Sequence, residues 1–126
     1  MKDEISVTFE GNYVQAISDG EKTFERAEQV WTEIVRVCRK HNCFAVLGIS
    51  RSMPPVTVHE GFDHAELFER LGITQQYRIA WVELHREAQN TFLFIETVLV
   101  NRGLPGRVFH DISEAKRWLL GSNRAG

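Results

Sequence analysis

The sequence has few of the features that mark membrane or exported proteins. Its apolar runs are only a few residues long, far below the roughly twenty residues that span a bilayer. The first residues, Met1-Lys2-Asp3-Glu4, are polar and contain no apolar core of a signal peptide. We therefore expect a cytoplasmic protein that does not insert stably into membranes.

The sequence also lacks a strongly basic segment. Its 15 Lys and Arg residues are mixed with 17 Asp and Glu residues, which gives a formal net charge of −2. Proteins that bind nucleic acid usually carry a basic stripe that contacts phosphates. The charge pattern therefore predicts that nucleic acid is not a partner.

Sequence motifs of known enzyme classes are absent. There is no Gly-x-Ser-x-Gly, no phosphate-binding loop and no Gly-x-Gly-x-x-Gly. His59 and His64 are five residues apart, whereas a helical zinc site needs histidines four apart. The two cysteines, Cys38 and Cys43, match no common zinc or redox spacing and are typical of small buried hydrophobes. We therefore predict a protein that is not an enzyme and that holds no metal or cofactor.

The chain has the size and composition of one globular domain. It has 126 residues, of which 43% are apolar and 25% charged, and residues 1–126 fit a single domain. Alternation and helical spacing predict strands at 5–9 and 13–17, joined by a Gly11-Asn12 turn, and a helix at 23–41 capped by Thr23. A strand at 44–49, a helix at 62–71, a strand at 77–84, a helix at 86–101, a strand at 107–109 and a terminal helix follow.

The order of these elements indicates the fold class. Asp63 with Glu66, and Asp111 with Glu114, have the spacing of capping boxes at the starts of two helices. The order β-β-α-β-α-β-α-β-α predicts an α/β domain with a mixed, mostly parallel sheet and helices mainly on one face. Trp31, Trp81 and Trp118 lie on the apolar periodicity of their elements and are expected in the core.

Two segments of the C-terminal half resemble a known family. The strand Tyr77-Arg78-Ile79-Ala80-Trp81-Val82 is similar to an R-x-A-x-V strand of the SpoIIAA-like family, which has the STAS fold. The segment Arg107-Val108-Phe109-His110-Asp111, followed by Glu114-Ala115-Lys116-Arg117-Trp118-Leu119, is similar to its closing V-x-F-x-D…E-A-x-x-W-L. The order of elements extends the resemblance over nearly the whole chain.

The resemblance implies a small cytoplasmic binding protein, often a homodimer, with a fold similar to the lipid-carrying CRAL-TRIO domains. Regulatory STAS proteins carry an Asp-Ser-Ser-Gly phosphoacceptor after the third strand. The corresponding stretch here, His59-Glu60-Gly61-Phe62-Asp63, contains no serine. Regulation through that serine is therefore not expected.

One edge of the predicted sheet gathers polar side chains. In open parallel sheets, ligands bind outside the carboxyl ends of the strands. The segments that leave those ends, or follow them, supply the residues that we predict for a polar ligand site: Arg51, His59, Phe62, His64, His85 and His110. The alternative, which we favour because loops are commonly polar, is that these histidines are merely solvated.

The predicted helix at 86–101 is apolar over more than one stripe. Consecutive helical residues point about 100° apart, so its apolar run cannot face only the sheet. The residues that we predict for its second face are Phe92, Phe94, Ile95 and Val98. That face would form a homodimer interface or the wall of an apolar pocket, unless the helix is simply a deep core helix.

Three functions are consistent with these features. The first is a non-enzymatic STAS-like binding or regulatory module that acts through protein contact as a homodimer. The second is a carrier or sensor of a small apolar or amphipathic molecule, held between the helices at 62–71 and 86–101. The third, an enzyme that uses the histidine-rich edge, is the least supported because no catalytic motif accompanies those residues.

Overall fold

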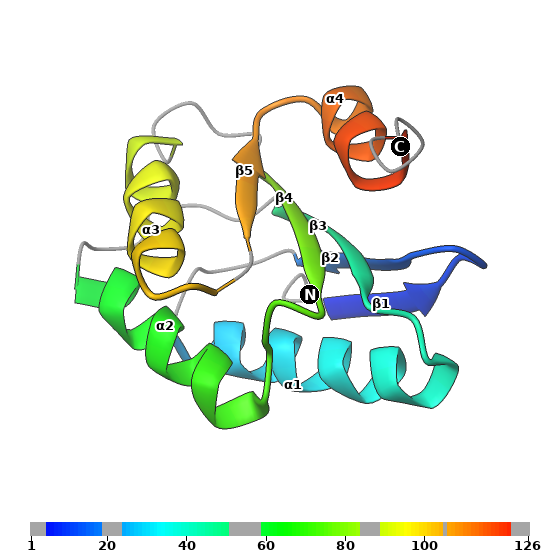
Figure 1. Cartoon of the computed structure of the whole chain (residues 1–126), viewed down its shortest axis with the longest axis horizontal. Helices are drawn as coiled ribbons and strands as arrows, with labels where there is room; N and C mark the ends of the chain where they lie inside the picture. Colours follow the sequence, from blue (N-terminus) through cyan, green and yellow to red (C-terminus); the bar gives the residue numbers. More distant parts are fainter. Residues whose placement is uncertain (1–4, 19–23, 51–58, 84–88, 105, 122–126) are drawn as a thin grey trace.

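The computed structural model describes residues 5–18, 24–50, 59–83, 89–104 and 106–121. The elements alternate between strands and helices after an initial pair of strands (Figure 1). They are β1 (Ile5–Phe9), β2 (Val14–Ser18), α1 (Phe24–His41), β3 (Ala45–Ser50), α2 (His59–Leu71), β4 (Arg78–Glu83), α3 (Gln89–Asn101), β5 (Arg107–Phe109), α4 (Ile112–Lys116) and the π-helical turn η2 (Arg117–Gly121).

The five strands form one mixed sheet in the order β1-β2-β3-β4-β5. β1 is antiparallel to β2, and the remaining neighbours are parallel. The predicted α/β class with a mixed, mostly parallel sheet is confirmed. Because consecutive parallel strands are joined by helices, the carboxyl ends of β2, β3 and β4 meet at one edge of the sheet.

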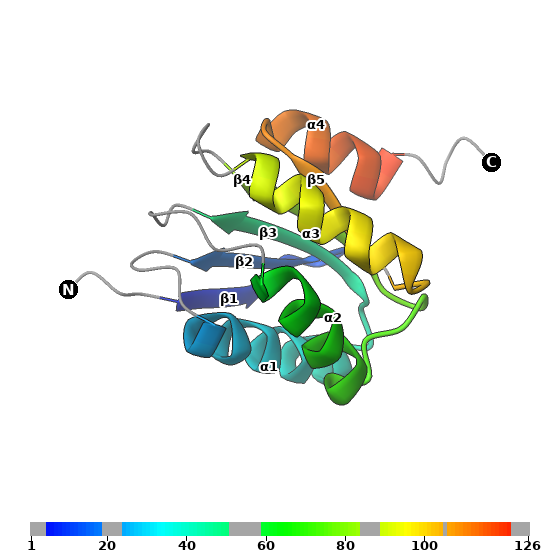
Figure 2. The same ribbon diagram turned by 90° about the vertical axis from the view of Figure 1, so that its left-hand side faces the viewer.

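Helices cover both faces of the sheet unequally, as Figure 2 shows. α1, α2 and α3 share one hydrophobic core with one face of the sheet, and α4 and η2 pack on the opposite face. Alternation along β3 divides its side chains between the two layers, with Val46 on the α1–α3 side and Leu47 and Ile49 on the α4 side. The continuous apolar run of this strand is therefore explained by burial on both faces.

The larger core centres on aromatic side chains from a helix and a strand. Trp31 of α1 packs edge-on against Phe68 of α2, with 4.7 Å between ring centroids. Trp31 also lies 5.3 Å from the ring of Trp81 on β4. Trp31 is buried, whereas Trp81 and Trp118 are half-buried, so the expectation that the tryptophans contribute to packing is confirmed.

The hairpin between β1 and β2 turns at Gly11-Asn12 as predicted, but its second strand begins at Val14 and not at Tyr13. The last paired residues are Phe9 and Val14, so residues 10–13 connect the strands and Tyr13 belongs to the connection. Glu10 N–H donates to the Tyr13 carbonyl at 2.8 Å, and Gly11 has a φ of 101°, which favours glycine. This hydrogen bond joins the two residues that flank Gly11-Asn12, as a two-residue turn requires, so the predicted turn is confirmed.

One predicted helix start is wrong and another is confirmed. α2 begins at His59, so Asp63 lies inside the helix and is not its cap. An Asp and a Glu three residues apart also occur on one face within a helix, and a single glycine costs a helix only about 1 kcal/mol. At α4, Asp111 is the N-cap and its carboxylate accepts a hydrogen bond from Ser113 N–H at 3.1 Å. The predicted cap Thr23 and the predicted helix start at Arg86 lie outside the described residues.

Candidate functional site

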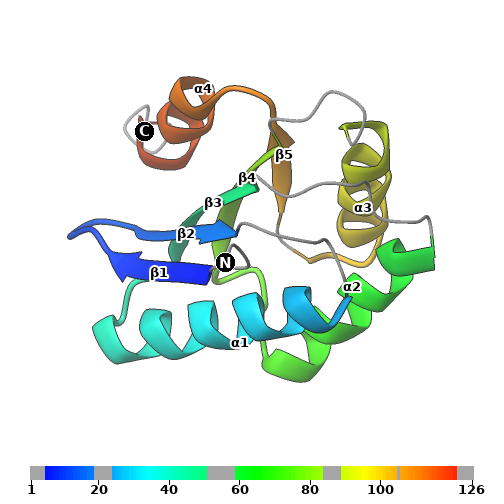
Figure 3. The same cartoon turned by 180° about the vertical axis from the view of Figure 1, so that it is seen from behind.

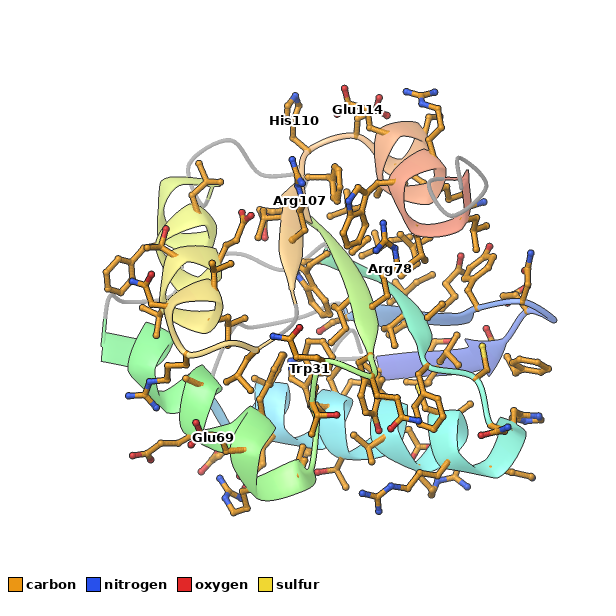
Figure 4. All side chains as sticks on the ribbon, viewed as in Figure 1. Trp31, Glu69, Arg78, Arg107, His110 and Glu114 are labelled. Carbon is orange, nitrogen blue, oxygen red and sulfur yellow. The ribbon has the colours of Figure 1, made fainter. Side chains whose placement is uncertain are left out.

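Most of the side chains predicted for a polar ligand site are not among those that the structure describes. Arg51 and His85 are not described, and for His59, Phe62 and His64 only the helical backbone of α2 is described. His110 is the remaining one, and it is exposed directly after β5. Figure 4 places it beside Glu114 and pointing away from the sheet. The structure therefore does not bring the predicted residues together into a described site.

Chemistry at this edge is limited by the roles that its residues already have. The carboxylate of Asp111 caps α4, and the part of the chain that the structure describes contains no group of three or more His, Cys, Asp or Glu residues that could hold a metal ion. The geometry around His110 thus shows neither a partnered base nor a metal centre.

A row of buried polar residues closes the strands at the same edge of the sheet. Ser18 is the register partner of Ser50, and Ser50 is the register partner of Glu83. Their relative exposures are 8%, 3% and 0%. In the sequence, each of the three follows an apolar residue at the end of a predicted strand. Only the strand register shows that the three are neighbours. These three polar residues, which were not among the predicted ones, are buried at the ends of their strands.

A groove between α1 and α2 is lined by charged side chains. Its volume is about 520 Å³, and its lining includes Arg36, Arg39, Glu69 and Arg70. Arg70 pairs with Glu28 at 2.8 Å, and Arg102 lies 4.0 Å from Glu69. Arg70 is thus paired with a carboxylate outside the groove, and Glu69 with an arginine outside it.

The other two arginines of this groove are also engaged. Arg36 donates to Glu33, and this hydrogen bond lowers the pKa of the Glu33 carboxyl group. Arg39 donates to the carbonyl of Leu71 at the end of α2, at 3.4 Å. Exposed pairs of this kind contribute little stability, and a helix carboxyl end does not attract anions. The groove therefore lacks the electrostatics of an anion site.

The two cysteines do not form a reactive site. Cys38 is fully buried, and burial, with a smaller contribution from Cys43, raises the pKa of its thiol to about 12. A thiol with such a pKa is protonated at neutral pH and is not a nucleophile. Burial likewise raises the pKa of Tyr77, which lies in the same core. The expectation that Cys38 is a small buried hydrophobe is confirmed.

α3 is the helix on which the sequence placed an apolar second face. Val98 and Leu99 are buried in the core, and Phe94 is half-buried against it. The side chains of Phe92 and Ile95 lie outside the description. Val98 and Phe94, which we had assigned to the second face, therefore pack inward, and the described apolar residues of α3 that point outward are Leu93 and Val100.

The outward residues of α3 form an uncharged stripe. Leu93 and Val100 have exposures of 49% and 58%, the described large hydrophobic residues that are most open to solvent. Thr97 lies between them, is exposed, and donates its hydroxyl hydrogen bond to the backbone carbonyl of Leu93 at 3.1 Å. We call Leu93, Thr97 and Val100 the α3 outer face. The sequence signal for it was the low amphipathicity of the helix, which does not show which side is inside.

The charges of α3 support this description. Within Gln89–Asn101, Glu96 is the single charged residue. Its carboxylate is half-buried and accepts a hydrogen bond from Val108 N–H of β5 at 3.4 Å. The α3 outer face therefore carries no charged group, in contrast to the outer surface of α1, which exposes Glu25, Arg36, Arg39 and Lys40.

The carrier hypothesis places a ligand between α2 and α3. The described residues of these two helices pack into one core and do not add support for it. Leu67 and Phe68 of α2 share a single hydrophobic cluster with Val98 and Leu99 of α3. A described groove of about 520 Å³ lies between α1 and α2.

Comparisons with protein-family models, with curated proteins and with solved structures found no match to this chain. In the described part of the chain, none of the helices has both the length and the apolar composition that crossing a bilayer requires.

Proposed function

We propose that this protein is a STAS-like binding module that acts through protein contact, without catalysis, as a homodimer. Its α/β architecture and the two C-terminal segments that resemble the SpoIIAA-like family support this assignment. The surface that binds the partner protein is the α3 outer face.

The observation that carries the proposal is an exposed apolar stripe without charge. Single exposed apolar residues are common on protein surfaces. Here Leu93 and Val100 are seven residues apart on one side of α3, about 10 Å along the helix axis. Thr97 completes the stripe with a hydroxyl that is already hydrogen-bonded within the helix. Two exposed apolar side chains on one uncharged face of a helix are the pair that an apolar partner surface would cover.

The chemistry of the stripe defines the partner surface. A charged partner group placed on the α3 outer face would lose its hydration and gain no counter-charge there. An aliphatic, uncharged surface, such as one side of an amphipathic helix, would bury Leu93 and Val100 without that cost. The expected partner is therefore another protein that presents such a helix.

Site-specific photo-crosslinking tests this proposal in the native host. A photo-reactive amino acid at position 97 should crosslink to one partner protein, which mass spectrometry can identify. The purified partner should then bind the chain with a Kd that Leu93→Glu raises about tenfold or more, because the new carboxylate would be desolvated at the contact.

The control places the same photo-reactive group at Glu114, which is exposed on the opposite layer. Figure 4 shows Glu114 on α4, far from α3. Position 114 should not capture the same partner. Capture from both positions, or unchanged partner binding by Leu93→Glu, would show that the α3 outer face is not the binding surface.

A further inference from the structure

The two edges of the sheet differ in how well they are protected. An edge strand offers unpaired backbone N–H and C=O groups, and proteins usually blunt such edges with charge, proline or short strands. β5 is only three residues long and begins with Arg107. The carboxylate of Glu96 also accepts a hydrogen bond from Val108 N–H at 3.4 Å, which occupies a backbone donor of this edge strand. The β5 edge is therefore blocked.

β1, at the other edge, has none of these protections. Its sequence, Ile-Ser-Val-Thr-Phe, contains no charged residue and no proline. It pairs with β2 in a continuous register without a bulge, and within the described part of the chain β2 is its one neighbour in the sheet. In Figure 3, β1 lies at the open end of the sheet opposite β5, above α1. A five-residue, uncharged edge strand is a template for pairing with another strand.

The apolar side of β1 is also incompletely covered. Ile5, Val7 and Phe9 pack against the core but are only half-buried, whereas Ser6 and Thr8 are exposed on the other face. A strand added along β1 would cover the remaining apolar surface of these three residues, because neighbouring strands in a sheet lie only about 5 Å apart.

The sequence of β1 matches itself in antiparallel pairing. A pairing centred on Val7 sets Val7 opposite Val7 of the second copy, Ser6 opposite Thr8, and Ile5 opposite Phe9. Apolar residues then face apolar residues and polar residues face polar ones, so no residue is moved to the wrong face. Branched and aromatic pairs across strands are favourable, and within the five residues of β1 no like charges are opposed.

The helix beside β1 adds electrostatic complementarity. In an antiparallel pair, the two-fold axis stands perpendicular to the sheet, so both copies of α1 lie on the same side of the joined sheet and run in opposite directions. α1 begins with Glu25 in its first turn and ends with Arg39 and Lys40 in its last turn. The acidic first turn of α1 in each copy would therefore lie toward the basic last turn of α1 in the other copy.

Taking the module to be a homodimer, as proposed above, we infer that two copies of this chain join through antiparallel pairing of their β1 strands. The joined sheet has ten strands, and the α3 outer face of each copy remains exposed for the partner protein. This interface differs from the α3 interface that the sequence analysis gave as one of its alternatives, and it adds backbone hydrogen bonds that fix a register.

Two double variants at the same positions test this interface. Ser6 of one copy faces Thr8 of the other in the inferred pairing, twice by symmetry. Ser6→Lys/Thr8→Lys places like charges opposite each other, and we expect the dimer Kd to rise roughly tenfold or more. Ser6→Glu/Thr8→Lys places opposite charges there, and we expect the dimer to persist. Light scattering after size exclusion, over a range of concentrations, gives both results.

The outcomes separate this inference from the proposed function. Circular dichroism should show both variants folded, because Ser6 and Thr8 are exposed. A wild-type dimer that both variants preserve would place the interface elsewhere and overturn the β1 inference, while leaving the homodimer intact. A wild-type chain that stays monomeric at high micromolar concentration would overturn the homodimer itself. Dissociation by both variants to the same extent would also contradict the pairing, because it would show no dependence on the sign of the opposed charges.

Discussion

Trp81 lies directly over Gly48, its register partner on the neighbouring strand β3. A Cβ atom built on Gly48 would overlap the six-membered ring of the Trp81 indole. The glycine therefore makes room for the ring, which in turn contacts Trp31 of α1 and links helix and sheet.

Gly48→Ala should destabilise the protein for this reason. The new methyl group would force the ring of Trp81 away from Trp31, and overpacking of this kind costs about 1–3 kcal/mol of the free energy of unfolding. Urea unfolding measures the change. Gly121→Ala is the matched control, since nothing lies within 4 Å of its added Cβ, and it should change stability by less than about 0.5 kcal/mol. Equal effects of the two variants would contradict the packing described for Trp81.

The orientation of α3 is tested by one substitution made at two positions. Val98 is 7% exposed and Val100 is 58% exposed. Val98→Ala should lower the free energy of unfolding by about 1–3 kcal/mol because it leaves a cavity, whereas Val100→Ala should change it by less than about 0.5 kcal/mol. Thermal unfolding of both variants gives the comparison. A larger loss for Val100→Ala would mean that the helix is rotated and that the α3 outer face is not exposed.

The cap at the start of α4 makes a smaller, local contribution. The carboxylate of Asp111 accepts a hydrogen bond from Ser113 N–H, and Asp111→Ala should cost about 1 kcal/mol. Asp111→Asn should retain most of the stability, because asparagine caps helices about as well as aspartate. Chemical denaturation distinguishes the two. A loss from Asp111→Asn as large as that from Asp111→Ala would show that the charge, and not the hydrogen bond, is what matters.

The pKa of Cys38 predicts both its reactivity and a pH dependence. Burial raises this pKa from 9.0 to about 12, so a thiol reagent at pH 8 should modify Cys43, which is half-buried, long before Cys38. Full reaction of both thiols should require denaturant. Fast labelling of Cys38 in the folded protein would contradict its burial.

The same shift makes the folded state less stable at high pH. The folded thiol holds its proton to a higher pH than the unfolded thiol does. Its contribution to stability is therefore complete below pH 9 and is lost as the pH rises toward 12. The thermal midpoint should fall over this range, and Cys38→Ala should reduce the fall without removing it, because burial also raises the pKa of Tyr77. An identical fall in Cys38→Ala would show that Cys38 does not contribute.

The sequence predicted the order of elements because local periodicity records it. The apolar run ending at Ile49 indicated a strand buried on both faces, and Val46–Ser50 are buried. The cap at Asp111 was also predicted correctly. Asp111 and Glu114 have the spacing of a capping box, and Asp111 directly precedes the first residue of α4. The start of α2 was wrong because the same spacing at Asp63 and Glu66 fits a helix interior equally well.

The functional surfaces were harder to predict because they depend on long-range packing. An apolar helix such as α3 has no strong polarity in its sequence, so only its contacts with the core show that Val98 points inward and Val100 outward. The row formed by Ser18, Ser50 and Glu83 depends on strand register, which no single segment encodes. The predicted histidine-rich edge stays a prediction, because of its histidines only His110 has a described side chain.

Native mass spectrometry of the freshly purified chain tests the central claim most directly, because it reports subunit number and bound molecules together. A homodimeric module that acts through protein contact should give a particle of twice the 14.5 kDa chain mass, with no co-purifying small molecule. A monomer that retains a lipid-like ligand through desalting would contradict this account and would favour a carrier instead.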